Sequence, residues 1–190
     1  AGGSTRERTH ATVARIAAES AVPPAAHLTC VEASRAEINE VAEAYWEAGV
    51  RHIVALRGDL PSGMGQYGEL QHANQLVEFI RQETGDWFHI EVAAYPETHP
   101  QAQSPSKDIA YFAQKIKAGA NSAITQYFFN SDAYFRFVDD AYQLGVDVPV
   151  VAGIMPITSS TQLLRFSDAC GAEIPRWIRL RLLAYGDDSA

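Results

Sequence analysis

Short apolar runs alternate with longer segments of helical periodicity along most of the chain. Runs rich in β-branched or apolar residues predict strands, and segments whose apolar residues recur at helical spacing predict helices. The alternation predicts parallel strands joined by crossover helices, in five βα units after an opening helix. The expected strands are residues 27–31, 52–56, 88–94, 123–129 and 148–155, and the expected helices are residues 8–20, 34–49, 70–82, 107–118, 132–144 and 160–170.

The second expected helix has the clearest boundaries. Ser34 and Glu37 have the spacing of a capping box, in which each side chain accepts the backbone N–H of the other residue. Gly49 stands where a glycine commonly ends a helix. Between them, helical spacing predicts a buried stripe. It consists of Ile38, Val41, Tyr45 and Ala48.

Polar clusters after the expected strands favour a (β/α)8 TIM barrel over an open doubly wound sheet. No G-x-G-x-x-G pattern directly follows a strand, whereas barrel enzymes place their chemistry at the carboxyl ends of strands. A complete barrel has roughly 250 residues. We therefore expect residues 1–190 to be a single, partial barrel domain with five of the eight strands. The polar clusters are residues 57–59, residues 95–100, Gln126, and Pro156 with residues 158–160.

The composition of the chain argues against some classes of binding partner. The chain has 15 Lys and Arg against 23 Asp and Glu, and this net charge of −8 argues against binding to nucleic acid or anionic membranes. Cys30 and Cys170 have no metal-binding spacing, so we expect free thiols in a reducing compartment. No apolar run reaches the roughly 18 residues of a membrane span, and the chain opens without a secretory signal. The sequence thus predicts a cytoplasmic protein without a metal site.

Several polar residues are candidates for ligand binding, each with a structural alternative. Gln126 interrupts an apolar strand, where an amide is costly unless it is hydrogen-bonded, so it is the best candidate. Asp59 is either a turn residue or a ligand contact of the glycine-bearing loop behind it. His99, a lone loop histidine, is more often structural than a metal ligand. Asp108 and Lys115 share a helix face, where they are either solvated charges or a phosphate-facing pair.

The chain also resembles the methylenetetrahydrofolate reductase family. The similar segments occur in the order of the family and cover essentially the whole chain. They are residues 27–30, 52–59, 93–97 with 99–100, 118–121, 124–129, 153–156 and 174–177.

This resemblance implies a barrel that holds FAD. In the family, NADH or NADPH reduces the flavin, which then passes the hydride to 5,10-methylenetetrahydrofolate in a ping-pong reaction that gives 5-methyltetrahydrofolate. The resemblance makes Asp59 the catalytic residue, and Asp59, Gln126 and Phe166 the substrate-binding residues. His72 is a departure, because relatives commonly carry a tyrosine there. The implied FAD contacts are His27, Arg57, Gly58, Asp59, His72, Ala73, Tyr95, His99, Asp108 and Lys115.

Some parts of the family pattern fall outside these 190 residues. The chain is expected to begin after the second strand and to lack the eighth, so the family's general-acid glutamate is missing, and Glu97 on another strand does not replace it. The family also implies a homo-oligomer. Two alternatives stay open: a metal-dependent aldolase or isomerase barrel using Asp59, Glu97 and His99, and a non-catalytic fragment that binds flavin or folate.

Overall fold

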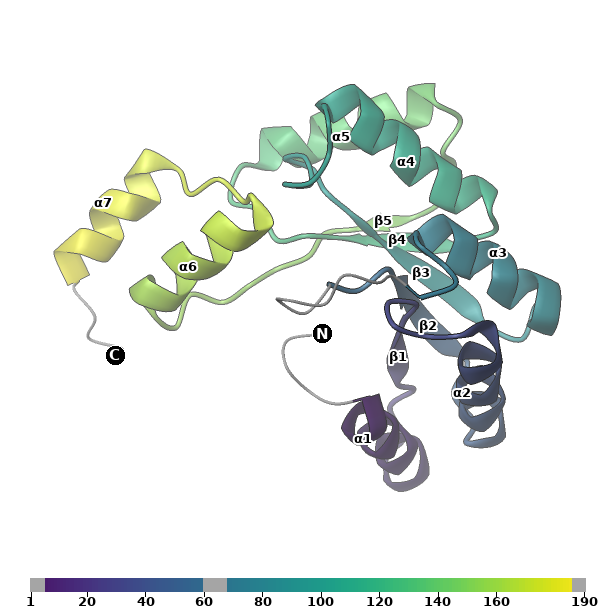
Figure 1. The fold of residues 1–190 in the computed structure, drawn as a ribbon. Coiled ribbons are helices and arrows are strands. Elements are labelled where there is room, and N and C mark those ends of the chain that lie inside the picture. The colour runs from purple at the N-terminus through teal and green to yellow at the C-terminus, as the bar shows by residue number, and fades with distance from the viewer. Residues whose placement is uncertain (1–5, 60–67, 186–190) are drawn as a thin grey trace. The chain divides into compact units, whose positions relative to one another are not determined.

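Helices and strands alternate in the protein, as the sequence predicts. The structure, a computed structural model, describes residues 6–59 and 68–185. Its strands are β1 (Ala25–Thr29), β2 (His52–Leu56), β3 (His89–Ala94), β4 (Ser122–Thr125) and β5 (Val150–Val151) (Figure 1). Its helices are α1 (Arg6–Glu19), α2 (Arg35–Glu47), α3 (Ala73–Thr84), α4 (Pro105–Lys117), α5 (Ser131–Gln143), α6 (Ser160–Cys170) and α7 (Arg176–Tyr185).

The five strands form one sheet in the order β1-β2-β3-β4-β5. β1 pairs with β2 and β2 with β3 in parallel. A doubly wound sheet reverses its strand order at a switch point, whereas successive strands of a barrel are neighbours throughout. The observed order is consistent with a partial TIM-barrel-like fold. The α/β fold is confirmed, and the complete eight-stranded barrel stays a prediction.

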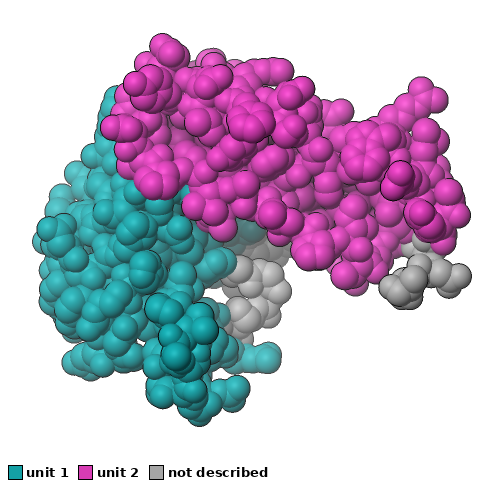
Figure 2. Space-filling view, turned by 180° about the vertical axis from the view of Figure 1, so that it is seen from behind, with its two compact units in different colours: residues 1–93, 114–123 teal, residues 94–113, 124–190 magenta. Residues whose placement is uncertain are grey.

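The chain divides into two compact units, which are described separately (Figure 2). Unit 1 comprises residues 1–93 and 114–123, and unit 2 comprises residues 94–113 and 124–190. The expectation of a single domain stays a prediction. Within the part of the chain that the structure describes, no helix has the length and apolar character needed to span a membrane.

The core of unit 1 lies between the strands of the sheet and the helices that pack on them. Ile53 on β2 is paired in register with Ile90 on β3, and both are fully buried. α3 packs on β2, and its buried residues include Leu76 and Ile80, which lie on one face because they are four positions apart. Burying each such side chain stabilises the fold by about 1.5–3 kcal/mol.

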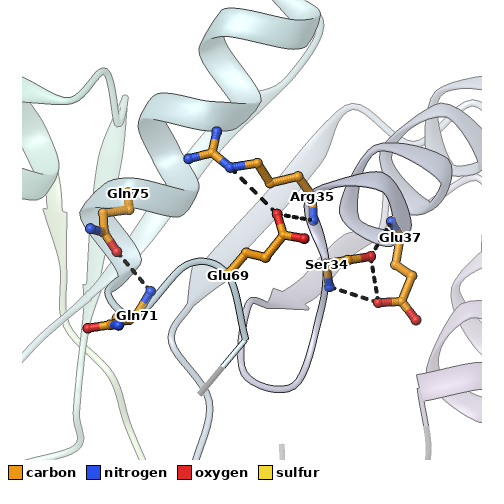
Figure 3. Close-up of polar contacts among 6 residues, drawn as sticks. All are labelled: Ser34, Arg35, Glu37, Glu69, Gln71 and Gln75. Carbon is orange, nitrogen blue, oxygen red and sulfur yellow. Dashed lines mark hydrogen bonds and ion pairs between the residues drawn. The ribbon is translucent and has the colours of Figure 1, made fainter. Parts of the chain in front are cut away.

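The capping box of α2 is present as predicted. The Ser34 hydroxyl accepts the Glu37 N–H at 3.2 Å, and the Glu37 carboxylate accepts the Ser34 N–H at 2.8 Å (Figure 3). Beside it, Glu69 accepts the backbone N–H of Arg35 at 3.3 Å and lies 3.8 Å from its guanidinium Nε atom. The start of α2 is thus joined to the segment that leads into α3.

The stripe predicted on α2 is right in part. Ile38 and Tyr45 are buried, but Val41 and Ala48 are only half-buried, and Ala42 takes the inner position. Positions 38, 42 and 45 follow the i, i+4, i+7 spacing of one helix face. The other two residues flank that face.

The core of unit 2 forms around α6 and α7. The sequence pattern does not predict α7. Ile178 is the one residue of this helix that is buried. Its outer residues are exposed, and among its large hydrophobic residues Leu183 is the most exposed at 80%. The buried cluster consists of Tyr127, Leu163, Ala172, Ile174 and Ile178.

The bounds of four strands differ from the prediction. β1 begins and ends two residues earlier than expected, β3 begins one residue later, and β5 has only two residues. β4 ends at Thr125, so the expectation that Gln126 lies inside a strand is wrong. The strand ends there because the Gln126 side chain, not a neighbouring strand, accepts the N–H of Tyr127 at 3.0 Å.

One arginine fastens the loops that precede β3 and β4 in unit 1. The Arg81 guanidinium donates to the carbonyl oxygens of Gly119 at 2.9 Å, Gly85 at 3.0 Å and Phe88 at 2.9 Å. It also donates to the Asn121 side chain. These contacts satisfy backbone groups at the amino ends of the strands, opposite the ends where the candidate residues lie.

Candidate functional site

The turn after β2 carries Arg57, Gly58 and Asp59. Gly58 has φ +86°, and a Cβ atom there would lie 2.5 Å from the Cγ1 atom of Val31. Val31 donates its N–H to the carbonyl oxygen of Arg57 at 2.9 Å, which holds the turn beside the end of β1. Only glycine fits this conformation and this contact. Asp59 follows immediately, with an exposed side chain.

The buried thiol of Cys30 lies between two segments that carry predicted flavin contacts. Its Sγ atom is 3.6 Å from the carbonyl oxygen of Arg57 and 4.0 Å from that of His72. Burial raises the pKa of Cys30, so the thiol stays a weak donor. Cys30 and Cys170 are both free, as predicted, although Cys170 is only half-buried.

The remaining candidates of unit 1 lie on three elements. His27 is exposed on β1, paired in register with Val54. His72 is the exposed N-cap residue of α3, directly before Ala73, and its N–H donates to the Gln75 side chain at 3.1 Å. Lys115, half-buried on α4, donates to the carbonyl oxygen of Ala93 near the end of β3. The predicted phosphate-facing cation is therefore anchored at the carboxyl end of a strand.

Tyr95, His99 and Asp108 form a connected group in unit 2. The rings of Tyr95 and His99 pack edge to face with centroids 4.5 Å apart. The Asp108 carboxylate accepts the His99 N–H at 2.7 Å, and the Nδ1 atom of His99 accepts the Gln101 N–H at 3.0 Å. A neutral imidazole that accepts at Nδ1 carries its proton on Nε2. His99 is thus oriented by three neighbours.

No metal cluster accompanies His99. Across residues 6–59 and 68–185, the structure brings together no set of three His, Cys, Asp or Glu side chains that could hold a metal ion. The metal-dependent alternative uses Asp59 of unit 1 with Glu97 and His99 of unit 2, and it stays an alternative.

Gln126 lines a small cavity in unit 2 together with Tyr95 and Glu97. Its volume is about 10 Å³, close to the minimum that holds one water molecule. The half-buried Gln126 donates its backbone N–H to the carbonyl oxygen of Ala94 at 2.8 Å. The cavity thus brings together two residues predicted to contact ligands, Gln126 and Tyr95. Its full lining is Tyr95, Pro96, Glu97, Thr98, Gln126, Tyr127, Cys170, Gly171 and Ala172.

A buried hydrogen-bond network includes Tyr127 and Cys170, which line this cavity. The Tyr127 hydroxyl is 3.0 Å from the Ser167 hydroxyl, and the Cys170 thiol donates to it at 3.4 Å. Burial, with a smaller contribution from the Cys170 hydrogen bond, raises the pKa of Tyr127 to about 12. The network joins the segment after β4 to α6, on which Phe166 is the neighbour of Ser167.

Phe166 is 46% exposed, and it lies outside the buried cluster of unit 2. The Arg165 guanidinium is 5.3 Å from the centre of its ring. An exposed aromatic face on α6 is available for contact with a planar ligand. Its role in binding stays a prediction.

The structure therefore groups the candidates by unit. The arrangement also shows residues that sequence analysis missed. Glu97, set aside because its strand is not that of the missing acid, lines the cavity with Gln126, and Ser167 and Tyr127 support the same region. The polar run of residues 95–100 was a signal for Glu97, but nothing in the sequence links Ser167 to Tyr127. Unit 1 holds His27, Arg57, Gly58, Asp59, His72, Ala73 and Lys115, and unit 2 holds Tyr95, His99, Asp108, Gln126 and Phe166.

Comparison with known proteins decides the family. The family model described as methylenetetrahydrofolate reductase matches residues 1–190. The chain belongs to the methylenetetrahydrofolate reductase family. A 5,10-methylenetetrahydrofolate reductase of Escherichia coli K12 is 41% identical over 189 residues, which cover 100% of this chain and 62% of the relative. That of Pectobacterium carotovorum is 44% identical over 178 residues, or 94% of this chain and 58% of the relative.

The chain thus spans about three fifths of the length of these reductases. A rice relative named as a probable methylenetetrahydrofolate reductase (NADH) is 37% identical, over 96% of this chain and 33% of its own length. A solved protein from Clostridium thermocellum, described as binding two copies of 5-methyl-5,6,7,8-tetrahydrofolic acid, has a TM-score of 0.58 at 19% identity. It covers 91% of this chain and 59% of its own chain. At that identity, the likeness shows the fold alone.

Proposed function

We propose that the full-length protein is a FAD-dependent enzyme that reduces 5,10-methylenetetrahydrofolate to 5-methyltetrahydrofolate with NADH or NADPH. The observation that carries the proposal is the family match over residues 1–190, supported by relatives about two fifths identical that bear this activity in their names. In this proposal the five strands are an arc of an eight-stranded barrel. We also expect a cytoplasmic homo-oligomer.

The residues present fit a flavin cofactor. Tyr95 and His99 offer ring surfaces, and Lys115 and Arg57 offer cationic groups at the carboxyl ends of β3 and β2. Such cations suit a diphosphate, and aromatic surfaces suit a planar ring system. FAD would be held by these four residues with His27, Gly58, Asp59, His72, Ala73 and Asp108. When bound, it supplies hydride transfer between the nicotinamide and the folate.

Asp59 is the proposed catalytic residue. It stands exposed on a turn that Gly58 and Val31 fix in position. A fixed carboxylate stabilises positive charge that develops on a nearby substrate. In the proposed reaction, Asp59 would stabilise the cationic form of the folate that accepts the hydride.

Gln126 and Phe166 are the proposed substrate-binding partners of Asp59. The Gln126 amide oxygen accepts a backbone N–H, and its NH2 group would donate a hydrogen bond to the ligand. The half-exposed Phe166 ring offers stacking surface to a pterin or a nicotinamide. Both substrates would use this surface in turn, which gives ping-pong kinetics.

A visible spectrum of the purified full-length protein, reconstituted with FAD, tests the proposal. Anaerobic NADH or NADPH should bleach the flavin bands, and methylenetetrahydrofolate added afterwards should restore them. A protein that takes up no FAD, or one whose reduced flavin is not reoxidised by the folate, would contradict the proposal. In the second case, the non-catalytic binding protein becomes the better description.

A further inference from the structure

The carboxyl group of Glu97 joins two distant segments of unit 2. Glu97 lies in the turn after β3, two residues beyond Tyr95. Its Oε2 atom accepts the backbone N–H of Glu173 at 2.9 Å, a contact between positions 76 residues apart. Because Glu173 follows the end of α6, this hydrogen bond fixes the helix that carries Phe166 to the turn that carries Tyr95.

The other carboxyl oxygen of Glu97 is buried beside the cavity. Among the residues that the structure describes, its Oε1 atom has no hydrogen-bond partner. Burial raises the pKa of Glu97, the Glu173 N–H lowers it, and the Glu173 carboxylate raises it again. An unsatisfied buried acceptor costs free energy comparable to a lost hydrogen bond. A donor in the cavity would remove that cost.

Gln126 lines the same cavity. Its amide oxygen accepts the Tyr127 N–H, and the structure gives its NH2 group no hydrogen-bond acceptor among the described residues. The cavity of about 10 Å³ has room for about one water molecule, which needs two to four polar partners. A water that accepts from Gln126 and donates to Glu97 would satisfy both groups.

We infer that Glu97 is a positioning residue, which orients the NH2 group of Gln126 through one water molecule in this cavity while it holds the end of α6. The inference rests on the proposed function, in which Gln126 binds substrate. Glu97 contacts neither substrate nor cofactor in this arrangement. It acts through the amide, and it takes no part in proton transfer to the folate.

The variant Glu97→Gln in the full-length, FAD-loaded protein tests the inference. Glutamine keeps an acceptor for the Glu173 N–H, but it presents a donor where Oε1 accepted. We expect the KM for methylenetetrahydrofolate to rise about tenfold, the size of one lost hydrogen bond. The Tm should stay equal or rise, because a buried charge is removed. Asp168→Asn, which removes an exposed carboxylate from the same end of α6, should leave both values unchanged.

The pH profile separates this role from a purely structural one. Among the described residues, the titratable groups around the cavity and the Glu97 carboxyl are Tyr95, Tyr127, Cys170 and Glu173. In the wild type, the KM for the folate should rise as the pH falls through the raised pKa of Glu97, because a neutral carboxyl group accepts a weaker hydrogen bond. Glu97→Gln should lack this acidic limb.

Two results would overturn the inference. The first is a Glu97→Gln variant with the wild-type KM, and the second is a variant whose Tm and flavin content fall along with its activity. A high-resolution crystal structure of the full-length protein tests the water independently of turnover. Density within hydrogen-bonding distance of both Glu97 Oε1 and Gln126 Nε2 supports the inference, and a dry cavity refutes it. A wild type that fails to reduce the folate would refute the proposed function instead.

Discussion

In unit 1 the turn that carries Asp59 follows strands whose backbones are paired in register, whereas in unit 2 the turn that carries Tyr95 and His99 is held by side chains. β1, β2 and β3 place the Arg57–Asp59 turn by main-chain hydrogen bonds and by a glycine that packs on Val31. The turn after β3 depends on Asp108 and Glu97 instead. Replacing Asp59 in unit 1 should therefore change the chemistry without changing stability, whereas replacing Tyr127 in unit 2 should change stability, because its hydroxyl belongs to a buried hydrogen-bond network.

The largest expected effect comes from Asp59. Because its side chain is exposed on a turn fixed by the backbone, Asp59→Asn should leave stability unchanged. Reoxidation of the reduced flavin by methylenetetrahydrofolate should slow about 100-fold, the cost of removing one preorganised electrostatic group. Anaerobic stopped-flow absorbance measures this step, with the exposed Asp147→Asn as the control. A variant with the wild-type rate would remove Asp59 from the catalytic site.

Two glycine-to-alanine variants test how rigidly unit 1 holds the turn that carries Asp59. Gly58 and Gly49 have similar positive φ angles, +86° and +81°, but a Cβ atom at Gly49 would meet nothing within 4 Å. Gly49→Ala should cost about 1 kcal/mol of backbone strain. Gly58→Ala should cost about 3 kcal/mol, because overpacking against Val31 adds to the strain. Urea unfolding of the full-length protein compares them, and equal losses would show that the turn can move away from β1.

Alkaline pH should destabilise both units through one tyrosine each. Burial raises the pKa of Tyr45 in unit 1 and of Tyr127 in unit 2 to about 12, above the ordinary value of 10.0. The neutral phenols therefore favour the folded state fully below pH 10, and this contribution is lost as the pH rises to about 12. The loss is about 2 kcal/mol for each residue. Phenylalanine at either position should flatten the decline, measured as the free energy of unfolding against pH.

At neutral pH, replacing these two tyrosines by phenylalanine should change the folding stability in opposite directions. These are the smallest effects that we expect. The Tyr45 hydroxyl is buried without a partner among the described residues, so Tyr45→Phe should gain up to about 1 kcal/mol. Tyr127→Phe should lose about 1 kcal/mol, because Ser167 and Cys170 lose their common partner. Exposed Tyr142→Phe is the control for the loss of a hydroxyl. A loss of folding stability at both positions would contradict this difference between the units.

Hydrophobic periodicity was sufficient to predict most of the elements. Each strand and helix that was predicted exists, and the bounds of α6 match the prediction. Periodicity failed at β4 because the end of that strand depends on a side chain that bonds to its neighbour's backbone. It missed α7 because that helix buries little more than Ile178.

Residues of the candidate site could be predicted only where they differed in character from their neighbours in the sequence. Gln126 was chosen as a polar residue in an apolar run, and it does line a cavity, although it lies beyond the strand. Ser167 and Cys170 were not chosen, since their partner Tyr127 is 40 and 43 positions away. Contacts of that separation depend on the packing of α6, which no local pattern encodes.

Arg81 has a consequence for how this chain can change over evolutionary time. Its guanidinium secures the loops before β3 and β4 at the amino ends of the strands. Loops at the other end can therefore exchange residues without loosening that attachment. Divergence in ligand preference should accumulate at the carboxyl ends of the strands, whereas replacement of Arg81 should be selected against, because it would leave backbone groups without their hydrogen-bond donor.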